Sequence, residues 1–339
     1  MVGGGRDRDQ LVSKAHQSIE RGSRSFAVAA NLFDKPTRER AWMLYAWCRR
    51  CDDDTDGQDH GGTPTAPERD ARDRVKAIRI LTMRSLEGQP TADIGFDAFG
   101  QVAMEAGLTA DMAEDLIEGF ALDAEGWRPR TEADLMRYCY HVAGGVGVMM
   151  AKVMNVPPED EAMFDRACDL GLAFQLVNIS RDVAEDAAAG RCYLPVEWLV
   201  EADIPPGQHM RPEYRKELVA LVARVLDMAE RHEAAARIGA AQLPFRQRWA
   251  VLAAANIYGA IGRKVRRRGA KAWDKRVRVS AFGKFLHLIE ALLDAMKTPP
   301  EPEEWPRWTR GELLVMVRMA GPIAGIPQTP LPDEEEQSL

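Results

Sequence analysis

The segment Gly171-Leu-Ala-Phe-Gln-Leu-Val-Asn-Ile-Ser-Arg-Asp-Val-Ala-Glu-Asp186 carries the strongest structural signal in the chain. Its first half is apolar, and its second half places Asn178, Asp182 and Asp186 four residues apart. Side chains at i and i+4 of an α-helix lie on one face, so these three oxygen-bearing side chains form a stripe. A ladder of this kind on an otherwise apolar helix is hard to explain as a solvated surface, and it favours a polar site inside a helical protein.

The rest of the chain shows the same helical periodicity. Apolar residues recur at helical spacing, and no run of alternating β-branched residues is bounded by hairpin turns. We therefore predict an all-α fold. The expected helices cover residues 8–21, 37–56, 68–87, 92–106, 109–125, 132–154, 159–188, 211–238, 245–267 and 279–296.

Composition favours one globular domain flanked by two less regular segments. The chain has 339 residues, of which 46% are hydrophobic and 29% are charged, which is enough for a large core. We expect a flexible N-terminus at 1–10, a domain at 11–296 and a tail rich in proline and acids at 297–339 that has room for one short helix. Residues 58–67 are expected to form a loop after the first acidic segment.

Several features bear on the compartment and on partners. No apolar stretch approaches the roughly 20 residues of a membrane span, and the N-terminus lacks the apolar core of a signal peptide, so a cytoplasmic location is expected. The five cysteines are an odd number scattered through expected helices, which predicts reduced thiols. A net charge of -7 predicts no nucleic-acid partner. The local basic cluster at Arg263–Arg278 could be solvated, contact diphosphate or face anionic lipid.

A first acidic stripe ends the expected helix at 37–56. Asp52 and Asp56 lie one turn apart, and Tyr45 and Arg49 precede them on roughly the same side. One interpretation is a solvated helix end, because a chain with 52 acids produces such pairs by chance. The apolar sequence before the acids favours the other interpretation, a metal or a cavity. Asp53 and Asp54 complete the acidic run, and we expect the extra charge of Asp54 to face solvent.

The ligand types in both stripes suit Mg²⁺, which prefers oxygen ligands and is commonly held by one or two carboxylates plus substrate phosphate. Cys48 and Cys51 form a C-x-x-C pair, but no second pair follows at the spacing of a zinc site and no β-α context suits a redox motif. Two facing acidic stripes in a helical bundle fit chemistry in which diphosphate departs. Cations would then neutralise the leaving group, and a dry apolar cavity would shelter a carbocation.

Taken together, the motifs resemble those of the squalene/phytoene synthase family, and most closely its bacterial phytoene synthases. The resemblance covers about residues 13–290 and keeps the family's order. Its segments are Gly22–Phe26, Leu44–Arg49 with the acids that follow, Tyr138–Gly144, Asn178–Asp186, Gly190–Pro195, and Ala254–Tyr258 running through the basic cluster to Trp273 and Arg276.

The resemblance implies an isoprenoid-synthase-type helical bundle around a central cavity, with site residues of three kinds. The metal ligands would be Asp52, Asp56, Asn178, Asp182 and Asp186. The catalytic residues would be Tyr45, Arg49, Tyr138, Arg181 and Tyr258. The substrate-binding residues would be Ser23, Ser25, Asp53, Tyr193 and Arg276.

The resemblance also implies an activity. Two geranylgeranyl diphosphates would condense head to head through prephytoene diphosphate to phytoene, in a reaction that depends on Mg²⁺, with Mn²⁺ as a substitute, and that needs no NADPH. Peripheral contact with the inner face of the membrane and contact with other carotenoid-pathway enzymes would suit such products. The alternatives are a squalene-type or dehydrosqualene synthase acting on farnesyl diphosphate, and a non-catalytic homologue that serves as a binding or assembly factor.

Overall fold

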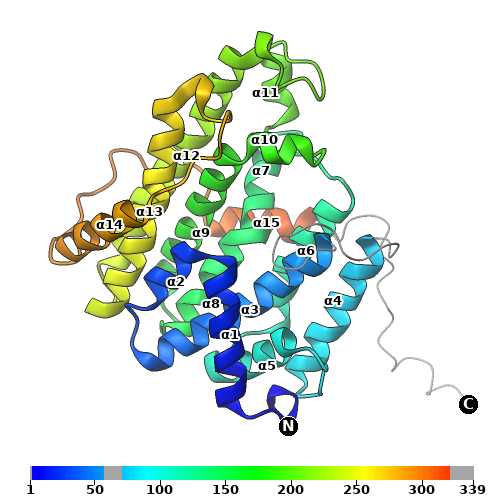
Figure 1. The fold of residues 1–339 in the computed structure, drawn as a ribbon, viewed down its shortest axis with the longest axis vertical. Helices are drawn as coiled ribbons and strands as arrows, with labels where there is room; N and C mark the ends of the chain where they lie inside the picture. Colours follow the sequence, from blue (N-terminus) through cyan, green and yellow to red (C-terminus); the bar gives the residue numbers. More distant parts are fainter. Residues whose placement is uncertain (1, 57–70, 321–339) are drawn as a thin grey trace, which may run out of the picture.

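The computed structural model describes residues 2–56 and 71–320 (Figure 1). Every regular secondary-structure element assigned in these residues is helical. The all-α prediction is confirmed. The expected loop at 58–67 lies outside the described residues. The α-helices are α1 Arg8–Gly22, α2 Arg24–Ala30, α3 Lys35–Asp56, α4 Ala71–Leu86, α5 Ile94–Ala106, α6 Ala110–Ala124, α7 Glu132–Cys139, α8 Gly145–Val153, α9 Glu161–Arg181, α10 Val183–Ala188, α11 Val196–Glu201, α12 Arg215–Ala240, α13 Phe245–Arg268, α14 Ala281–Asp294 and α15 Arg310–Ala320.

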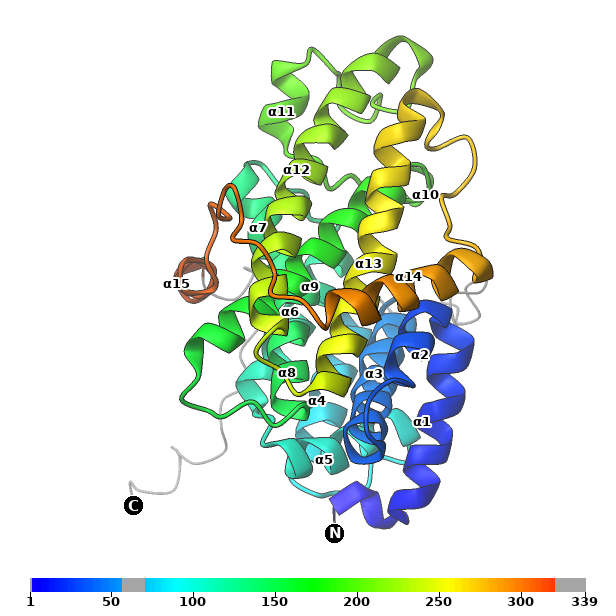
Figure 2. The ribbon, with the colours of Figure 1, turned by 90° about the vertical axis from the view of Figure 1, so that its left-hand side faces the viewer.

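Helix α9, which carries the first half of the opening segment, lies at the centre of the bundle. It packs against α8, α12 and α13, and α12 and α13 run upright beside it in Figure 2. Gly171 permits the close approach of α9 to the segment that leads into α8, because a Cβ atom there would lie 2.2 Å from the carbonyl oxygen of Ala143. The central helix is therefore fixed on several sides by its neighbours.

The expected continuous helix at 159–188 is interrupted at Asp182, which separates α9 from α10. Asp182 has φ -100° and ψ 16°, outside the helical range. The four-residue hydrogen bonds nevertheless continue across the break, from Asp182 N–H to the Asn178 carbonyl at 2.9 Å and from Asp186 N–H to the Asp182 carbonyl at 2.8 Å. The stripe thus keeps its spacing although the helix does not stay regular. Gly190, with φ 75°, follows the end of α10.

The expected helix at 132–154 is also divided. Helix α7 starts at a capping box formed by Thr131 and Asp134, and a five-residue π-helix, Tyr140–Gly144, joins α7 to α8. Such π segments inside α-helices frequently lie at functional sites. Val142 and Ala143 of this segment line the central cavity described below.

Helix α3 is buried along most of its length, as its apolar sequence predicts. It lies between α1 and α5 and holds Trp47, which is fully buried. The Trp47 ring stacks on Phe99 with ring centroids 3.9 Å apart, and its Nε1–H donates to Thr82 Oγ1 at 3.2 Å. These contacts fix the helix that ends in the first acidic stripe.

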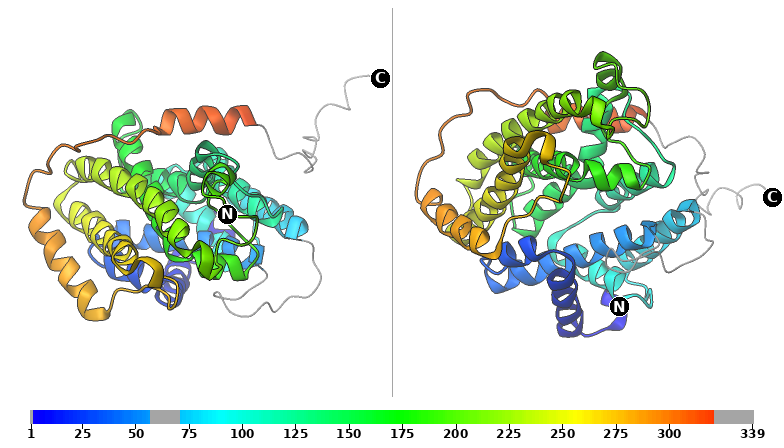
Figure 3. Two further views of the ribbon diagram at one scale, coloured as in Figure 1. Left: turned by 90° about the horizontal axis from the view of Figure 1, so that it is seen from above. Right: turned by 45° about the horizontal axis from the view of Figure 1, so that its top comes forward.

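The C-terminal elements lie on the outside of the bundle. Helix α14 crosses the outer side of α13, and α15 packs against α7 and α9 at another edge (Figure 3). Arg310 anchors α15 through ion pairs to Asp165, at 2.7 Å, and to Glu161. Within the described residues, no helix is both long and apolar enough to cross a bilayer.

Candidate active site

A cavity of about 1360 Å³ runs through the bundle. On α9 its lining extends from Met163 to Arg181, which corresponds to about 27 Å of helix at 1.5 Å per residue. The volume exceeds the roughly 300–1,000 Å³ of ordinary ligand pockets. The predicted site residues that line the cavity are Ser23, Ser25, Tyr45, Arg49, Asp52, Tyr138, Asn178, Arg181, Tyr258 and Arg276.

At the end of α3, Arg49 lies between two carboxylates of the first stripe. Its Nη1 is 3.0 Å from Asp52 Oδ2 and its Nη2 is 2.6 Å from Asp53 Oδ1. The Asp52 side chain is 47% exposed and faces the cavity, whereas that of Asp53 is only 6% exposed and does not line it. Asp56 is the last residue of α3, and its side chain lies outside the described part of the structure.

The Asp54 side chain is only 26% exposed and is held in an ion pair, so, contrary to the expectation, it does not extend freely into solvent. Its carboxylate pairs with Arg50 at 2.9 Å, and Arg50 also pairs with Asp93 at 2.9 Å, at the start of α5. Burial raises the pKa of Asp54 to about 6, although Arg50 opposes the shift. The extra acid therefore ties α3 to α5, and the neighbouring Thr55 is buried with its hydroxyl donating to the Cys51 carbonyl at 2.8 Å.

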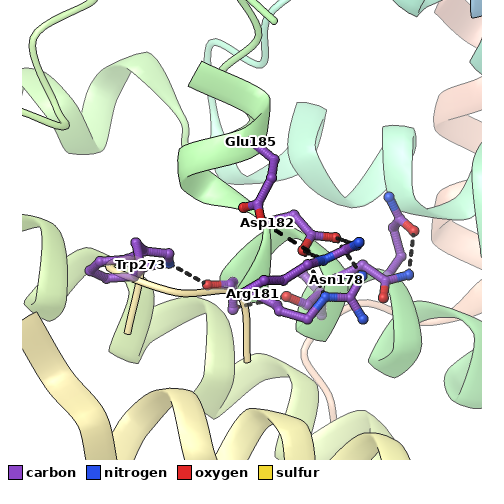
Figure 4. Close-up of polar contacts among 9 residues, drawn as sticks. Asn178, Arg181, Asp182, Glu185 and Trp273 are labelled. Carbon is purple, nitrogen blue, oxygen red and sulfur yellow. Dashed lines mark hydrogen bonds and ion pairs between the residues drawn. The ribbon is translucent and has the colours of Figure 1, made fainter. Parts of the chain in front are cut away.

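In the second stripe, two arginines donate hydrogen bonds to the Asp182 carboxylate (Figure 4). Arg276 donates from Nε and Nη2 to the two carboxylate oxygens, both at 2.9 Å, and Arg181 donates from Nε at 2.7 Å. Burial alone would raise the pKa of Asp182, but the hydrogen bonds from both guanidinium groups outweigh it and hold the pKa below its usual range. The indole N–H of Trp273 donates to the Ser180 carbonyl at 2.9 Å. This hydrogen bond fixes the loop that carries Arg276.

The other two members of the second stripe are less well satisfied. The Oδ1 atom of Asn178 is buried and finds no hydrogen-bond partner among the described residues. Burial, together with the nearby charge of Asp182, raises the pKa of Asp186 to about 7. A buried acceptor without a donor and a carboxylate that is costly to ionise are both groups that a cation would stabilise.

Asp123 is a site residue that the sequence analysis missed. It lies near the end of α6 and lines the cavity. Its two carboxylate oxygens accept hydrogen bonds from Tyr138, at 2.9 Å, and from Tyr193, at 2.7 Å, and the two phenol rings stack with centroids 4.8 Å apart. Burial and the adjacent Asp123 charge raise the pKa of Tyr138 well above its usual value, so the phenol stays protonated. Helical spacing could have identified Asp123, because it lies on the same face of α6 as the buried residues Leu116 and Phe120.

An aromatic cluster forms one part of the cavity wall. Tyr258 stacks on Phe174 with centroids 4.2 Å apart and lies 5.4 Å from the Phe26 ring, which in turn lies 6.4 Å from Tyr45. All four side chains line the cavity. The sequence predicted Tyr45 and Tyr258 for this site but not Phe26 and Phe174, whose spacing gave no sign that they meet.

The serines predicted for substrate binding lie beside this cluster. Ser23 caps α2, with its Oγ accepting a hydrogen bond from Phe26 N–H at 3.3 Å, and Ser25 follows in the first turn. Gly22 leaves room for Tyr45, since a Cβ atom there would lie 2.3 Å from the Tyr45 hydroxyl oxygen. The chain around Gly22 thus brings two hydroxyl groups and a phenol to one side of the cavity.

The surroundings of the C-x-x-C pair disfavour a metal or redox centre. Burial raises the pKa of the Cys48 thiol to about 12 and that of Cys51 well above its usual value, which disfavours the thiolate form. Within the described residues, no three His, Cys, Asp or Glu side chains converge as a ready-made metal site.

The family model for squalene/phytoene synthases matches residues 19–283. The chain belongs to the squalene/phytoene synthase family. Among the family's curated bacterial members, the phytoene synthase of Pseudescherichia vulneris is 44% identical over 304 residues, covering 88% of this chain and 98% of the relative. The 15-cis-phytoene synthase of Pantoea ananas is 41% identical, with the same coverage.

Solved structures of the family share the fold. A dehydrosqualene synthase bound to a ligand superimposes with a TM-score of 0.73 and 26% sequence identity, covering 84% of this chain and 96% of the other. A squalene synthase of Alicyclobacillus acidocaldarius, at 21% identity, superimposes with a TM-score of 0.65 over 77% of this chain and 95% of its own. The prediction of an isoprenoid-synthase-type bundle is therefore confirmed.

Proposed function

We propose that this protein is a phytoene synthase. It would condense two geranylgeranyl diphosphates head to head through prephytoene diphosphate to phytoene, with release of diphosphate. The observation that carries the proposal is the match over 88% of the chain to relatives named phytoene synthase at 41% and 44% identity. The large cavity, which carries cations and carboxylates as well as apolar walls, supports it, because two long prenyl chains and their diphosphates need both surroundings.

Mg²⁺ is the metal that we propose for this site, with Mn²⁺ as a substitute. The holders would be Asp52 and Asp56 of α3 together with Asn178, Asp182 and Asp186 of the second stripe. The unpartnered Asn178 oxygen and the raised pKa of Asp186 support this assignment, since both groups would gain from a hard cation. When bound, the metal would supply charge neutralisation for departing diphosphate.

The arginines of the site would hold diphosphate oxygens. Arg49, Arg181 and Arg276 line the cavity, and each is paired with a carboxylate that could exchange for a phosphate. Arginine presents donors in a planar fork that fits phosphate oxygens in pairs. Ser23 and Ser25, which also line the cavity, would add hydroxyl donors. Asp53 would keep Arg49 oriented through its 2.6 Å contact.

The aromatic cluster would protect the carbocation once diphosphate has left. The π faces of Phe26, Tyr45, Phe174 and Tyr258 offer electron density to a cation, and they exclude water that would otherwise capture it. The stacked pair of Tyr138 and Tyr193, held by Asp123, would fix a second wall near the reacting carbons. These roles need no reductant, so we propose that the enzyme uses no NADPH.

A second candidate function uses farnesyl diphosphate and yields a dehydrosqualene-type or squalene-type product. The structural likeness to a dehydrosqualene synthase at 26% identity favours it. The two candidates differ in prenyl chain length and therefore in how far along the cavity the hydrocarbon extends. We rank geranylgeranyl diphosphate first because the more similar relatives carry the phytoene synthase name.

The direct test is to incubate the purified protein with geranylgeranyl or farnesyl diphosphate in the presence of Mg²⁺, with and without NADPH, and to identify the hydrocarbon by mass spectrometry. The proposal predicts phytoene and free diphosphate, with a yield that NADPH does not change. Failure to release diphosphate from either substrate would refute the enzymatic assignment and would favour a non-catalytic role.

A further inference from the structure

Helix α14 presents an apolar stripe to the outside of the molecule. Its side chains are 41% to 70% exposed, and all are large. They occur at i, i+3, i+4, i+7 and i+11, which at about 100° per residue places them within an arc of about 100°. The members of the stripe are Phe282, Phe285, Leu286, Ile289 and Leu293, and the exposed Met296 follows just after the helix.

The opposite face of α14 is fixed to the bundle. Trp249 Nε1–H donates to the Leu288 carbonyl at 2.8 Å, and Arg248 donates to the Ala295 carbonyl at 3.1 Å. Ala291 and Ala295 are buried against α13. A surface helix normally points its apolar face inward and its polar face outward. Helix α14 is anchored by its inner face, so the apolar stripe is held outward rather than exposed by loose packing.

The stripe is continuous with the central cavity. Phe285 lines the cavity and is also 59% exposed, so its ring lies at the rim between the interior and the outside. Leu288 and Lys284, also on α14, line the cavity as well. Helix α14 therefore contributes to the cavity wall on one side and presents an apolar surface on the other.

Positive charge is concentrated directly before this helix. Residues 263–278 contain nine lysines and arginines and one acid, although the whole chain has a net charge of -7. The segment covers the end of α13 and the connection to α14, and Lys264 Nζ ties it together by donating to the Arg278 carbonyl at 2.8 Å. Arg267, Lys271 and Lys275 are exposed there. An apolar stripe that directly follows a basic segment in the chain matches the two layers of an anionic membrane surface.

We propose that α14 docks this protein on an anionic lipid bilayer. The apolar stripe would enter the boundary between headgroups and acyl chains, and the basic segment would lie against the headgroups. The inference rests on the proposed function, because that function explains why the protein would dock on a membrane. Prenyl chains would enter the cavity, and a hydrocarbon product would leave it, past Phe285 without crossing water. A second copy of the chain fits the stripe less well, because a twofold contact through α14 would bring two basic segments together.

Vesicle flotation tests the proposal without substrate. The full chain is mixed with vesicles of phosphatidylcholine alone or with about 30% phosphatidylglycerol. Flotation with the anionic vesicles is expected. The variant Phe282→Ser/Ile289→Ser/Leu293→Ser should bind at least about tenfold more weakly, because three apolar side chains no longer enter the bilayer. None of these three side chains lines the cavity.

Two further variants separate the contributions. Ile80→Ser/Met104→Ser/Val200→Ser removes side chains that are 57% to 68% exposed on other helices, and it should float like the parent. Arg267→Gln/Lys271→Gln/Lys275→Gln should bind anionic vesicles about as weakly as neutral ones. Thermal unfolding of every variant confirms that each is folded.

The outcomes that overturn the proposal are distinct from failure of the proposed function. A parent protein that does not float, or an α14 variant that floats like the parent, would refute docking. A parent that sediments as a dimer and an α14 variant that sediments as a monomer would assign the stripe to a second copy instead. Detergent-dispersed geranylgeranyl diphosphate checks the activity separately, and the α14 variant should turn it over within about twofold of the parent rate. Loss of activity in the parent would refute the function and leave the flotation result standing.

Discussion

At the scale of single residues, the two acidic stripes differ in how their charges are balanced. On α3 Arg49 contacts both Asp52 and Asp53, whereas after α9 Arg181 and Arg276 both contact Asp182. Arg276 also lies 3.9 Å from Glu185, so the two guanidinium groups face two carboxylates. Both arginines line the cavity, which places them to turn toward an anionic ligand.

Asp182→Asn should lower kcat by about a hundredfold or more. The amide cannot balance two arginines, and it removes an anionic ligand from the proposed metal site. The melting temperature should stay within a few degrees of that of the parent, since Asp182 lies at the junction of α9 and α10 and outside the hydrophobic core. The matched control is Asp227→Asn, which removes a half-exposed partner of Arg266 and should change neither quantity. Near-normal turnover in Asp182→Asn would contradict the assigned role.

Asp123 is predicted to act through the two tyrosines that it orients. Asp123→Asn should reduce turnover by about tenfold or more, because Tyr138 and Tyr193 lose a charged acceptor. A double-mutant cycle with Tyr138→Phe separates positioning from stability. We expect a coupling of about 1 kcal/mol or more between the two substitutions in their effect on kcat. Additive effects would show that Asp123 and Tyr138 act independently.

The sequence predicted much of this site but missed residues whose role depends on long-range packing. The stripes were visible because their spacing is local, within one or two helical turns. Phe26 and Phe174 were not singled out, since they meet Tyr258 only after α2, α9 and α13 pack around one cavity. The exposure of Asp54 was misjudged for a similar reason. Its partner Arg50 also pairs with Asp93, which belongs to a distant segment.

At the scale of elements, helical periodicity located the long helices within a few residues of their ends. It did not predict α2 and α11, which are too short to show a full amphipathic pattern. The break at Asp182 also escaped prediction, because the four-residue hydrogen bonds persist on either side of it. The π-helix at Tyr140–Gly144 could not be predicted either. One extra residue per turn does not change the pattern of a mostly apolar segment.

The close packing of α9 on the segment before α8 makes a prediction about stability. Gly171→Ala should lower the free energy of unfolding by about 1–3 kcal/mol, because the added methyl group would collide with the Ala143 carbonyl. Gly311→Ala in α15 is the matched control, since nothing lies within 4 Å of its added methyl group. Alanine favours a helix more than glycine does, so this control should be neutral or slightly stabilising. Urea unfolding of both variants measures the difference, and equal stability would contradict the packing argument.

At the scale of the whole molecule, Asp52 of the first stripe and Asn178 of the second line the same cavity. Mg²⁺ is commonly held by one or two carboxylates together with substrate phosphate. We therefore expect the metal and the diphosphate to bind together, each increasing the affinity for the other.

A thermal-shift experiment tests this mutual dependence. Mg²⁺ and inorganic diphosphate added together should raise the melting temperature by more than the sum of their separate effects, because each increases the affinity for the other. Asp182→Asn should lose the excess, and Asp227→Asn should keep it. Full stabilisation by Mg²⁺ alone would mean that the protein holds a complete metal site without diphosphate.

The central claim concerns the reaction and its chain length, and a competition assay tests both. Equal concentrations of geranylgeranyl and farnesyl diphosphate are offered to the full chain with Mg²⁺, and the hydrocarbons are quantified early in the reaction. Because each turnover joins two prenyl diphosphates, the ratio of products reports which substrate the site selects. The account predicts phytoene in at least about tenfold excess over any thirty-carbon product. A predominance of thirty-carbon hydrocarbon, or no hydrocarbon at all, would contradict it.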